Sequence, residues 1–302
     1  MNLSNNSKQS ENDVPVIKIV GVGDGALKHI HRMAHVMDKN AVEFIISNVK
    51  QHQEIPKSTR LQHEVIRFPE EKVLIREKLS GSDLVFIVAN LGGPDTAAAP
   101  EIARIAKETA ALTIGVVTIP LVSEATREKA ESELEQITKC VNTTIVVDKN
   151  GLLNSGDQAV YEAESLTLAD EMIGQTVRCF SFLSSKEKMI NVDFRDIKIL
   201  MENGGKGLIG YGAASGENRA IESAKKAIGS PFLKKQKFSE VRAILVSVVG
   251  DNSLKMSEVN ESAAFIQENA HEEATIIWGV SIDPNLEDQF QTTAIAADFR
   301  ND

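Results

Sequence analysis

Two carboxylates and an asparagine lie close together in the segment Asn191-Val-Asp-Phe-Arg-Asp196. Carboxylates can orient a water molecule for attack on a reacting group, so Asp193 and Asp196 make this segment a candidate catalytic loop, with the turn-forming Asn191 shaping it. The same pattern also fits a helix N-cap, with Asp193 capping a helix over residues 195–201. The two interpretations are compatible, because one side chain can serve both purposes.

A glycine-containing turn, Gly21-Val-Gly-Asp-Gly25, follows the first apolar segment of the chain. Gly21, Gly23 and Gly25 would let the backbone approach a phosphate, and the next helix would offer its N-terminus to the anion. Asp24 would place a negative charge at that point, which Lys28 could offset by pairing with the phosphate or with Asp24. Glycine turns of this kind also serve any doubly wound fold, so a purely structural turn is an equal alternative.

A second candidate loop, Ala89-Asn-Leu-Gly-Gly-Pro-Asp-Thr-Ala-Ala98, follows another apolar segment and leads into a helix. Gly92, Gly93 and Thr96 are residue types that suit an anion-binding loop at this place. Pro94, however, removes a backbone N–H, and Asp95 repels phosphate. The alternative is an ordinary strand-to-helix turn in which Thr96 or Asp95 is the N-cap.

Composition limits the classes of function. A chain of 302 residues with 42% hydrophobic and 25% charged residues can fold into two globular domains. Its net charge of −10 argues against a nucleic-acid partner, because phosphate binding needs a clustered positive face. Cys140 and Cys179 lack metal-ligand spacing, and no secretory signal precedes them, so a cytoplasmic location is expected. No apolar run reaches the roughly 18 to 20 residues that cross a bilayer, so direct membrane contact is not expected.

Short apolar runs alternate with amphipathic segments from residue 14 onward. This pattern is typical of βαβ units and predicts an α/β fold with a doubly wound parallel sheet, covered by helices on both faces. The expected organisation is a disordered tail at 1–13, an N-terminal domain at 14–155, a long central helix at 156–181 and a smaller mixed-sheet α/β domain at 182–302. The predicted strands are 16–21, 42–47, 84–89, 112–118, 144–147, 241–249, 275–282 and 291–297, and the other predicted helices are 32–37, 99–110, 124–140, 216–228 and 256–268.

Four motifs follow one another in the C-terminal half: Gly204-Gly-Lys-Gly-Leu-Ile-Gly-Tyr-Gly212, Ala214-Ser-Gly-Glu-Asn-Arg219, Glu258-Val-Asn-Glu261 and Ile276-Ile-Trp-Gly-Val-Ser-Ile-Asp283. By these motifs, together with Ile17-Lys-Ile-Val-Gly-Val-Gly23, the chain resembles the tubulin/FtsZ family of polymerising GTPases. The resemblance extends over about residues 15–299. It is strong in the C-terminal half and moderate in the N-terminal half.

The resemblance implies a site for GTP or GDP, with Mg²⁺ only where nucleotide binds. Both glycine-containing loops, Asn48, Glu124 and Asp170 would contact the nucleotide, and Asp170 would accept hydrogen bonds from the purine. A solvated acidic helix face is the alternative interpretation of Asp170. The resemblance also implies head-to-tail filaments, in which residues 191–196 of one subunit enter the nucleotide site of the next and place the attacking water.

Several segments expected to contact the nucleotide depart from the family pattern. The first loop lacks the family's run of glycines, and Val49 and Lys50 replace a Thr-Asp pair. Residues 60–79 contain no match to the loop that contacts the terminal phosphate, and residues 148–151 replace the family's Pro-Asn-Asp-Arg. The chain also ends at Asp302 without the adaptor-binding tail of a division FtsZ, so we expect either a truncated chain or a paralogue that does not recruit the usual membrane adaptors.

The sequence therefore predicts a cytoskeletal protein that assembles with itself or with a true FtsZ, with weak or absent GTP hydrolysis. The alternative is an active GTPase whose nucleotide site has been rebuilt around Lys28 and Lys50. A third hypothesis is a doubly wound domain that binds another small anion and does not polymerise, which would leave the 191–196 segment unexplained.

Overall fold

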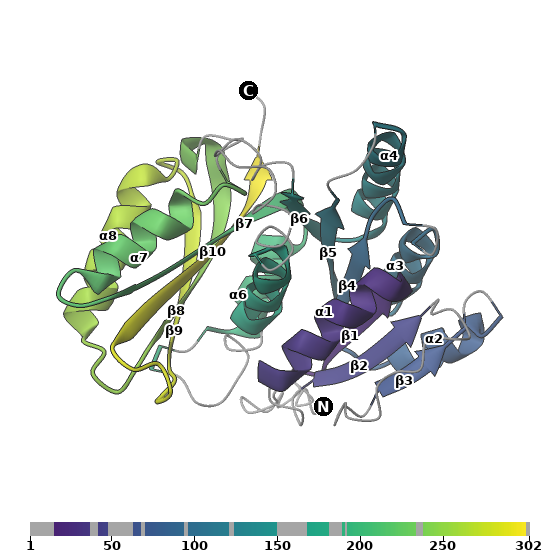
Figure 1. Cartoon of the computed structure of the whole chain (residues 1–302), viewed down its shortest axis with the longest axis horizontal. Helices are drawn as coiled ribbons and strands as arrows, with labels where there is room; N and C mark the ends of the chain where they lie inside the picture. The colour runs from purple at the N-terminus through teal and green to yellow at the C-terminus, as the bar shows by residue number, and fades with distance from the viewer. Residues whose placement is uncertain are drawn as a thin grey trace, which may run out of the picture.

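The computed structural model describes residues 15–36, 42–47, 63–67, 70–93, 96–120, 124–149, 168–180, 189–190, 192–233 and 238–299. Its strands form one ten-stranded sheet in the order β3-β2-β1-β4-β5-β6-β7-β10-β8-β9. Figure 1 shows a parallel N-terminal part of this sheet beside a mixed C-terminal part. Within the described part of the chain, no helix has the length and apolarity needed to cross a membrane.

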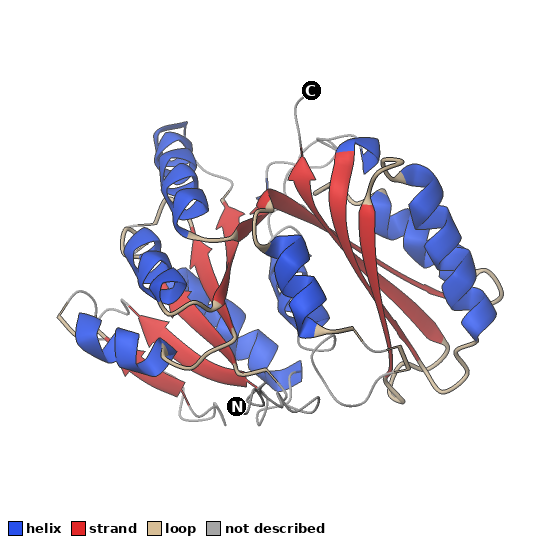
Figure 2. Cartoon of the chain, turned by 180° about the vertical axis from the view of Figure 1, so that it is seen from behind, coloured by secondary structure: helices blue, strands red, loops and turns tan. Residues whose placement is uncertain are grey.

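The N-terminal part of the sheet is buried on both faces, as its Val- and Ile-rich strands predict. The helix α1 and the helical residues 168–180 pack on one face, whereas α2, α3 and α4 cover the other (Figure 2). The parallel strands are β1 (Ile17–Val22), β2 (Val42–Ser47), β3 (His63–Ile66), β4 (Leu84–Asn90), β5 (Leu112–Ile119) and β6 (Thr143–Asp148), and the helices are α1 (Gly23–Val36), α2 (Lys72–Leu79), α3 (Ala99–Glu108) and α4 (Glu124–Cys140).

The C-terminal part begins with the long strand β7, which joins the two parts of the sheet. Its start pairs in parallel with β6 and its remainder pairs antiparallel with β10. The helices α7 and α8 pack on the outer face, and α6 lies on the inner face, toward the N-terminal half (Figure 1). The elements are α6 (Phe194–Met201), β7 (Gly205–Ser215), α7 (Arg219–Ile228), η2 (Phe238–Glu240), β8 (Val241–Gly250), α8 (Met256–Asn269), β9 (Thr275–Ile282) and β10 (Gln289–Phe299).

All eight predicted strands are confirmed, with end shifts of one or two residues. Four elements were not predicted: β3 and α2, whose periodicity is weak, the three-residue helix η2, and β7, whose glycines argue against a strand. The predicted helix at 32–37 was too short, because α1 begins at Gly23 and already buries Ala26 and Leu27. Of the predicted central helix, 168–180 is helical, and 156–167 and 181 lie outside the described residues, as does the predicted tail at 1–13.

Candidate functional site

The carboxyl ends of β1, β4, β5 and β6 meet at one edge of the parallel sheet. Ligands of open α/β sheets bind outside this edge, so the candidate site is built from the residues that follow these strands. The first loop predicted from sequence follows β1 there, and the second follows β4. The helical residues 168–180 pack over the same half of the sheet and carry Asp170.

The first predicted loop is largely helical. Gly21 lies within β1, and α1 begins at Gly23, which has a φ of 81°. Asp24 is in the first turn of α1, where the partial positive charge of the helix N-terminus favours a carboxylate. Its Oδ1 is buried and has no hydrogen-bond partner among the described residues. The turn expected at residues 21–25 is therefore a tight strand-to-helix junction.

Gly25 is a glycine because the chain itself approaches it closely. A Cβ at this position would lie 2.4 Å from Nδ2 of Asn90, the last residue of β4. The Oδ1 of Asn90 accepts a hydrogen bond from the hydroxyl of Thr118 (2.6 Å) and also contacts Nε2 of His29 (2.7 Å). The glycine of the predicted phosphate loop thus accommodates an internal polar cluster.

Asp170 is part of the same cluster. Its carboxylate forms an ion pair with Nδ1 of His29, whose side chain is only 3% exposed. Both ring nitrogens of His29 therefore face oxygen atoms, one from Asp170 and one from Asn90. His29 therefore links the helix that carries Asp170 to the carboxyl end of β4. The acidic group that was predicted to read a purine is already bonded within the chain.

The second predicted loop surrounds a carboxylate from α4. The backbone N–H of Gly92 donates a hydrogen bond to Oε2 of Glu133 (2.8 Å), and the hydroxyl of Thr96 donates to the same oxygen (2.9 Å). Thr96 also contacts the carbonyl oxygen of Gly93 (3.0 Å), and Lys129 donates to that carbonyl (2.6 Å). Gly92 and Thr96 thus converge on a group of the protein itself, and the carbonyl of Gly93 lies beside them.

The N-cap prediction for this loop was wrong for Thr96. The N-cap residue of α3 is Ala98, which makes no side-chain cap hydrogen bond. The Thr96 hydroxyl is used by Glu133 and Gly93 instead, so tertiary contacts decide its role. The other predicted cap, Asp95, lies outside the described residues, as does Pro94.

Four predicted site residues cannot be placed by their side chains. Asn48 and Asn191 lie outside the described residues. Lys28 is in α1 and Glu124 is the first residue of α4, but their side chains are outside the described part of the chain.

The predicted catalytic pair lies at the start of α6. Asp193 is the N-cap, and its carboxylate accepts a hydrogen bond from the backbone N–H of Arg195 (2.8 Å), which confirms the capping interpretation. Asp196 is exposed in the first helical turn. Just before this loop, the N–H of Met189 donates to the carbonyl of Val280 in β9 (3.0 Å). No hydrogen bond or ion pair between described residues joins either aspartate to the cluster around Asn90.

Sequence analysis missed four residues of this edge: His29, Asn90, Thr118 and Glu133. Asn90 and Thr118 sit at the carboxyl ends of buried strands, which is a usable signal, and His29 lies one turn after Gly25 on α1. Glu133 gave no signal, because it lies among other glutamates of a charged helix. A further residue, Lys149, follows β6 and is 4% exposed, and burial lowers its pKa.

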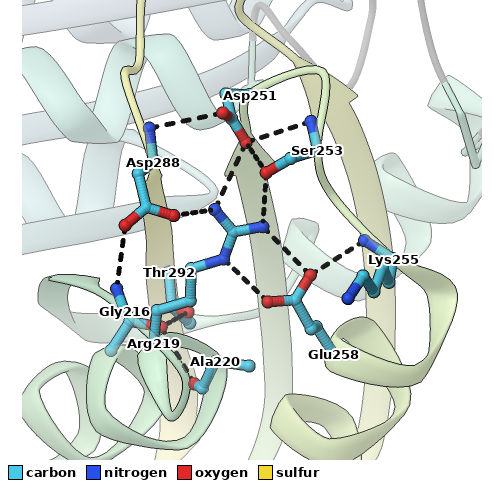
Figure 3. Close-up of polar contacts among 10 residues, drawn as sticks. Gly216, Arg219, Ala220, Asp251, Ser253, Lys255, Glu258, Asp288 and Thr292 are labelled. Carbon is cyan, nitrogen blue, oxygen red and sulfur yellow. Dashed lines mark hydrogen bonds and ion pairs between the residues drawn. The ribbon is translucent and has the colours of Figure 1, made fainter.

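A second polar cluster centres on Arg219 in the C-terminal half (Figure 3). The buried guanidinium makes two hydrogen bonds to the carboxylate of Glu258 (2.7 and 3.1 Å). It also contacts Asp251 (3.3 Å), Asp288 (3.1 Å) and the hydroxyl of Ser253 (3.0 Å). These partners come from α8 and from the loops after β8 and β9. One arginine therefore ties helix α8 and two loops of this half to the start of α7.

Charges in the Arg219 cluster stabilise one another. Hydrogen bonding to Arg219 holds the pKa of Glu258 below its ordinary value, and the carboxylates raise the pKa of Arg219. The pKa of Asp251 is also lowered, chiefly by a hydrogen bond from Ser253. The motifs around Arg219 and Glu258 thus act together as a structural unit.

Two family models match the chain. The model of the Tubulin/FtsZ family GTPase domain matches residues 67–157, and that of the FtsZ family C-terminal domain matches residues 205–300. Among solved structures, an FtsZ dimer of M. jannaschii, described as empty, is 27% identical, with a TM-score of 0.84, and the match covers 96% of this chain and 89% of that chain.

Two more distant structures share the fold. CetZ2 from Haloferax volcanii, a GTPγS-bound protofilament, is 14% identical with a TM-score of 0.66, and CetZ1 from the same organism, a GDP-bound monomer, is 15% identical with a TM-score of 0.70. Each match covers 93% of both chains. The two family models, the FtsZ structure and the two-part sheet agree with the resemblance seen in the sequence: the chain belongs to the tubulin/FtsZ family.

Proposed function

We propose that this protein assembles head to tail into filaments, alone or with a true FtsZ, and that it turns over GTP weakly or not at all. It is a cytoskeletal protein of the GTPase type by its family. Assembly then depends more on contacts between the surfaces of neighbouring subunits than on bound nucleotide.

The bonded state of Asp170 carries the proposal. A purine would need acceptors at this point, and the Asp170 carboxylate is already paired with His29, which is itself held by Asn90. Oδ1 of Asp170 is already paired with His29, so a purine would have to share the carboxylate or displace His29. Displacement would cost a hydrogen bond to a charged group, about 1.5–3 kcal/mol or about ten- to hundredfold in affinity. This pairing therefore disfavours a guanine nucleotide at this contact.

Head-to-tail assembly is supported by the placement of the expected nucleotide edge and the expected catalytic residues on different parts of the chain. The candidate nucleotide edge is in the N-terminal half, whereas Asp193 and Asp196 begin α6 and have no contact with that edge in the described part of the chain. An interface between such unlike surfaces is heterologous and generates open filaments. Relatives of this fold include an FtsZ dimer and a CetZ2 protofilament.

The first test measures nucleotide binding and assembly together. Purified protein is denatured to identify any released nucleotide, and the stripped protein is then titrated with GDP and GTP, with and without Mg²⁺. We expect no thermal stabilisation, because only a ligand that binds the folded state adds stability. Sedimentation should show the same polymer with and without GTP. Micromolar binding with GTP-dependent polymer would favour the active GTPase with a rebuilt site.

Replacing both Asp193 and Asp196 with asparagine should abolish any residual GTP hydrolysis. Positioned acid–base groups contribute about 10²- to 10⁴-fold to rate, so a measurable activity should fall below detection. Asparagine is as good an N-cap as aspartate, so the melting temperature should be unchanged. Asp193→Ala is the matched control for the cap and should cost about 1 kcal/mol of stability. Phosphate release that is unchanged in the double variant would contradict the catalytic assignment.

A further inference from the structure

The loop after β4 has residue types that suit an anion-binding loop, yet two of its donors meet a side chain of the same molecule. The N–H of Gly92 and the hydroxyl of Thr96 converge on a single oxygen, Oε2 of Glu133, at 2.8 and 2.9 Å. Two donors aimed at one carboxylate oxygen is the arrangement that a bound anion receives in a backbone nest. Glu133 comes from α4, which follows β5 in the chain, whereas the loop precedes β5.

The backbone at Gly92 is shaped for this contact. Gly92 has a φ of 82°, a conformation that residues with a Cβ rarely adopt. A Cβ there would also lie 2.9 Å from the carbonyl oxygen of Thr126 in α4. Glycine is therefore required both by the turn and by the close approach of the helix that supplies Glu133.

The carboxylate is buried and its charge is compensated. Glu133 is 6% exposed, which would be costly for an unpaired anion. Its second oxygen, Oε1, lies 3.7 Å from the ammonium of Lys129, one turn earlier on α4. Lys129 in turn donates to the carbonyl oxygen of Gly93 in the loop. The loop thus receives a negative group and a positive group from one helix face.

We propose that Glu133 is an internal anion ligand of the donors at Gly92 and Thr96, taking the hydrogen bonds that a bound phosphate or carboxylate would otherwise receive from them. Glu133 holds these two donors in place and closes them to phosphate. The contacts of Glu133 do not depend on the proposed function. Only one consequence rests on it, namely that this edge of the parallel sheet takes its shape without nucleotide.

The test is rescue by a small carboxylate. Glu133→Ala in the full chain removes the internal ligand, leaves the Gly92 N–H without this acceptor and leaves the Thr96 hydroxyl with the Gly93 carbonyl alone. Losing two hydrogen bonds to a buried carboxylate should lower the melting temperature by about 3 to 10 °C. Sodium acetate should restore part of this loss, because acetate supplies the missing carboxylate. Sodium chloride at equal ionic strength should not.

The matched control is Glu135→Ala on the same helix. Glu135 is exposed, so its variant has the same change in net charge without opening the loop. We expect its melting temperature to be close to that of the unmodified chain, with no selective effect of acetate. A Glu133→Ala protein as stable as the control, or acetate acting equally on all three proteins, would overturn the proposal.

A double-mutant cycle covers the case in which Glu133→Ala does not fold. Glu133→Met, which keeps most of the side-chain volume, and Thr96→Val are milder changes that each remove one end of the same hydrogen bond. Because they remove the same interaction, the melting temperature of the double variant should fall by clearly less than the sum of the single losses. Additive losses would contradict the proposal. None of these measurements uses nucleotide or polymer, so they can succeed even if the wild-type protein proves to be an active GTPase.

Discussion

Replacing Arg219 with methionine is expected to lower the free energy of unfolding by about 3–5 kcal/mol, the cost of removing one partner from a buried ion pair. Arg219 is 4% exposed, and its loss would leave the carboxylates of Glu258 and Asp251 close together without a cation. Asp288 is 66% exposed and can turn to water, so it should contribute little. Urea unfolding followed by circular dichroism measures the difference.

Two comparisons make the Arg219 result specific. Lys225→Met on the same helix removes an exposed cation paired with Glu222 and should change stability by less than about 1 kcal/mol. Acid should also act differently on the two variants. The lowered pKa of Glu258 gives stability that is present above its ordinary value of 4.5 and is lost as the pH falls through its folded value. Arg219→Met should have lost that component already; an unaltered acid transition would count against the assignment.

Replacing Gly212 with alanine is expected to destabilise the C-terminal half by about 3 kcal/mol, at the upper end of the cost of overpacking. A Cβ at Gly212 would lie 2.0 Å from the carbonyl oxygen of Ser223, and one at Gly210 would lie 1.9 Å from that of Ala227. Both contacts are with the backbone of α7, which cannot rotate away. Strand β7 and helix α7 would have to separate, and a lower urea midpoint with weakened near-ultraviolet circular dichroism should report it.

The control for Gly212→Ala is Lys206→Ala on the same strand. Lys206 is exposed, so shortening its side chain should leave stability within about 0.5 kcal/mol. If Gly212→Ala unfolds at the same urea concentration as this control, the close approach of α7 to β7 does not constrain the fold. The same close approach explains the Gly-Tyr-Gly part of the motif and the small residues of α7 that face it, Ala220, Ser223, Ala224 and Ala227.

The strands of the parallel sheet could be predicted because each is a short run that is buried on both faces. Such a run must be apolar along its whole length, as at 84–89 and 112–118. It can therefore be recognised as a strand without knowing which strand pairs with it. Strand β7 could not be predicted in this way. Its glycines lower strand propensity, and Gly210 and Gly212 are there because α7 packs directly against the backbone, which is a tertiary contact.

The cap at Asp193 could also be predicted, since an N-cap depends on residues within one turn of each other. The cap at Thr96 could not. Its hydroxyl is within reach of a helix N-terminus in sequence, but a buried carboxylate from α4 is a stronger acceptor than the backbone it would have capped. Local rules hold where no distant group competes for the same atom.

By itself the sequence determined the order of most strands and helices, the family and the position of the two loops, because periodicity and turn residues act over a few positions. The tertiary structure alone decided what those loops hold. His29 meets Asp170, and Glu133 meets Gly92, across 141 and 41 positions of the chain, and such pairs leave no mark in local patterns. The physical reason is that a buried polar atom must be satisfied by whichever group the fold brings to it, and sequence distance does not enter.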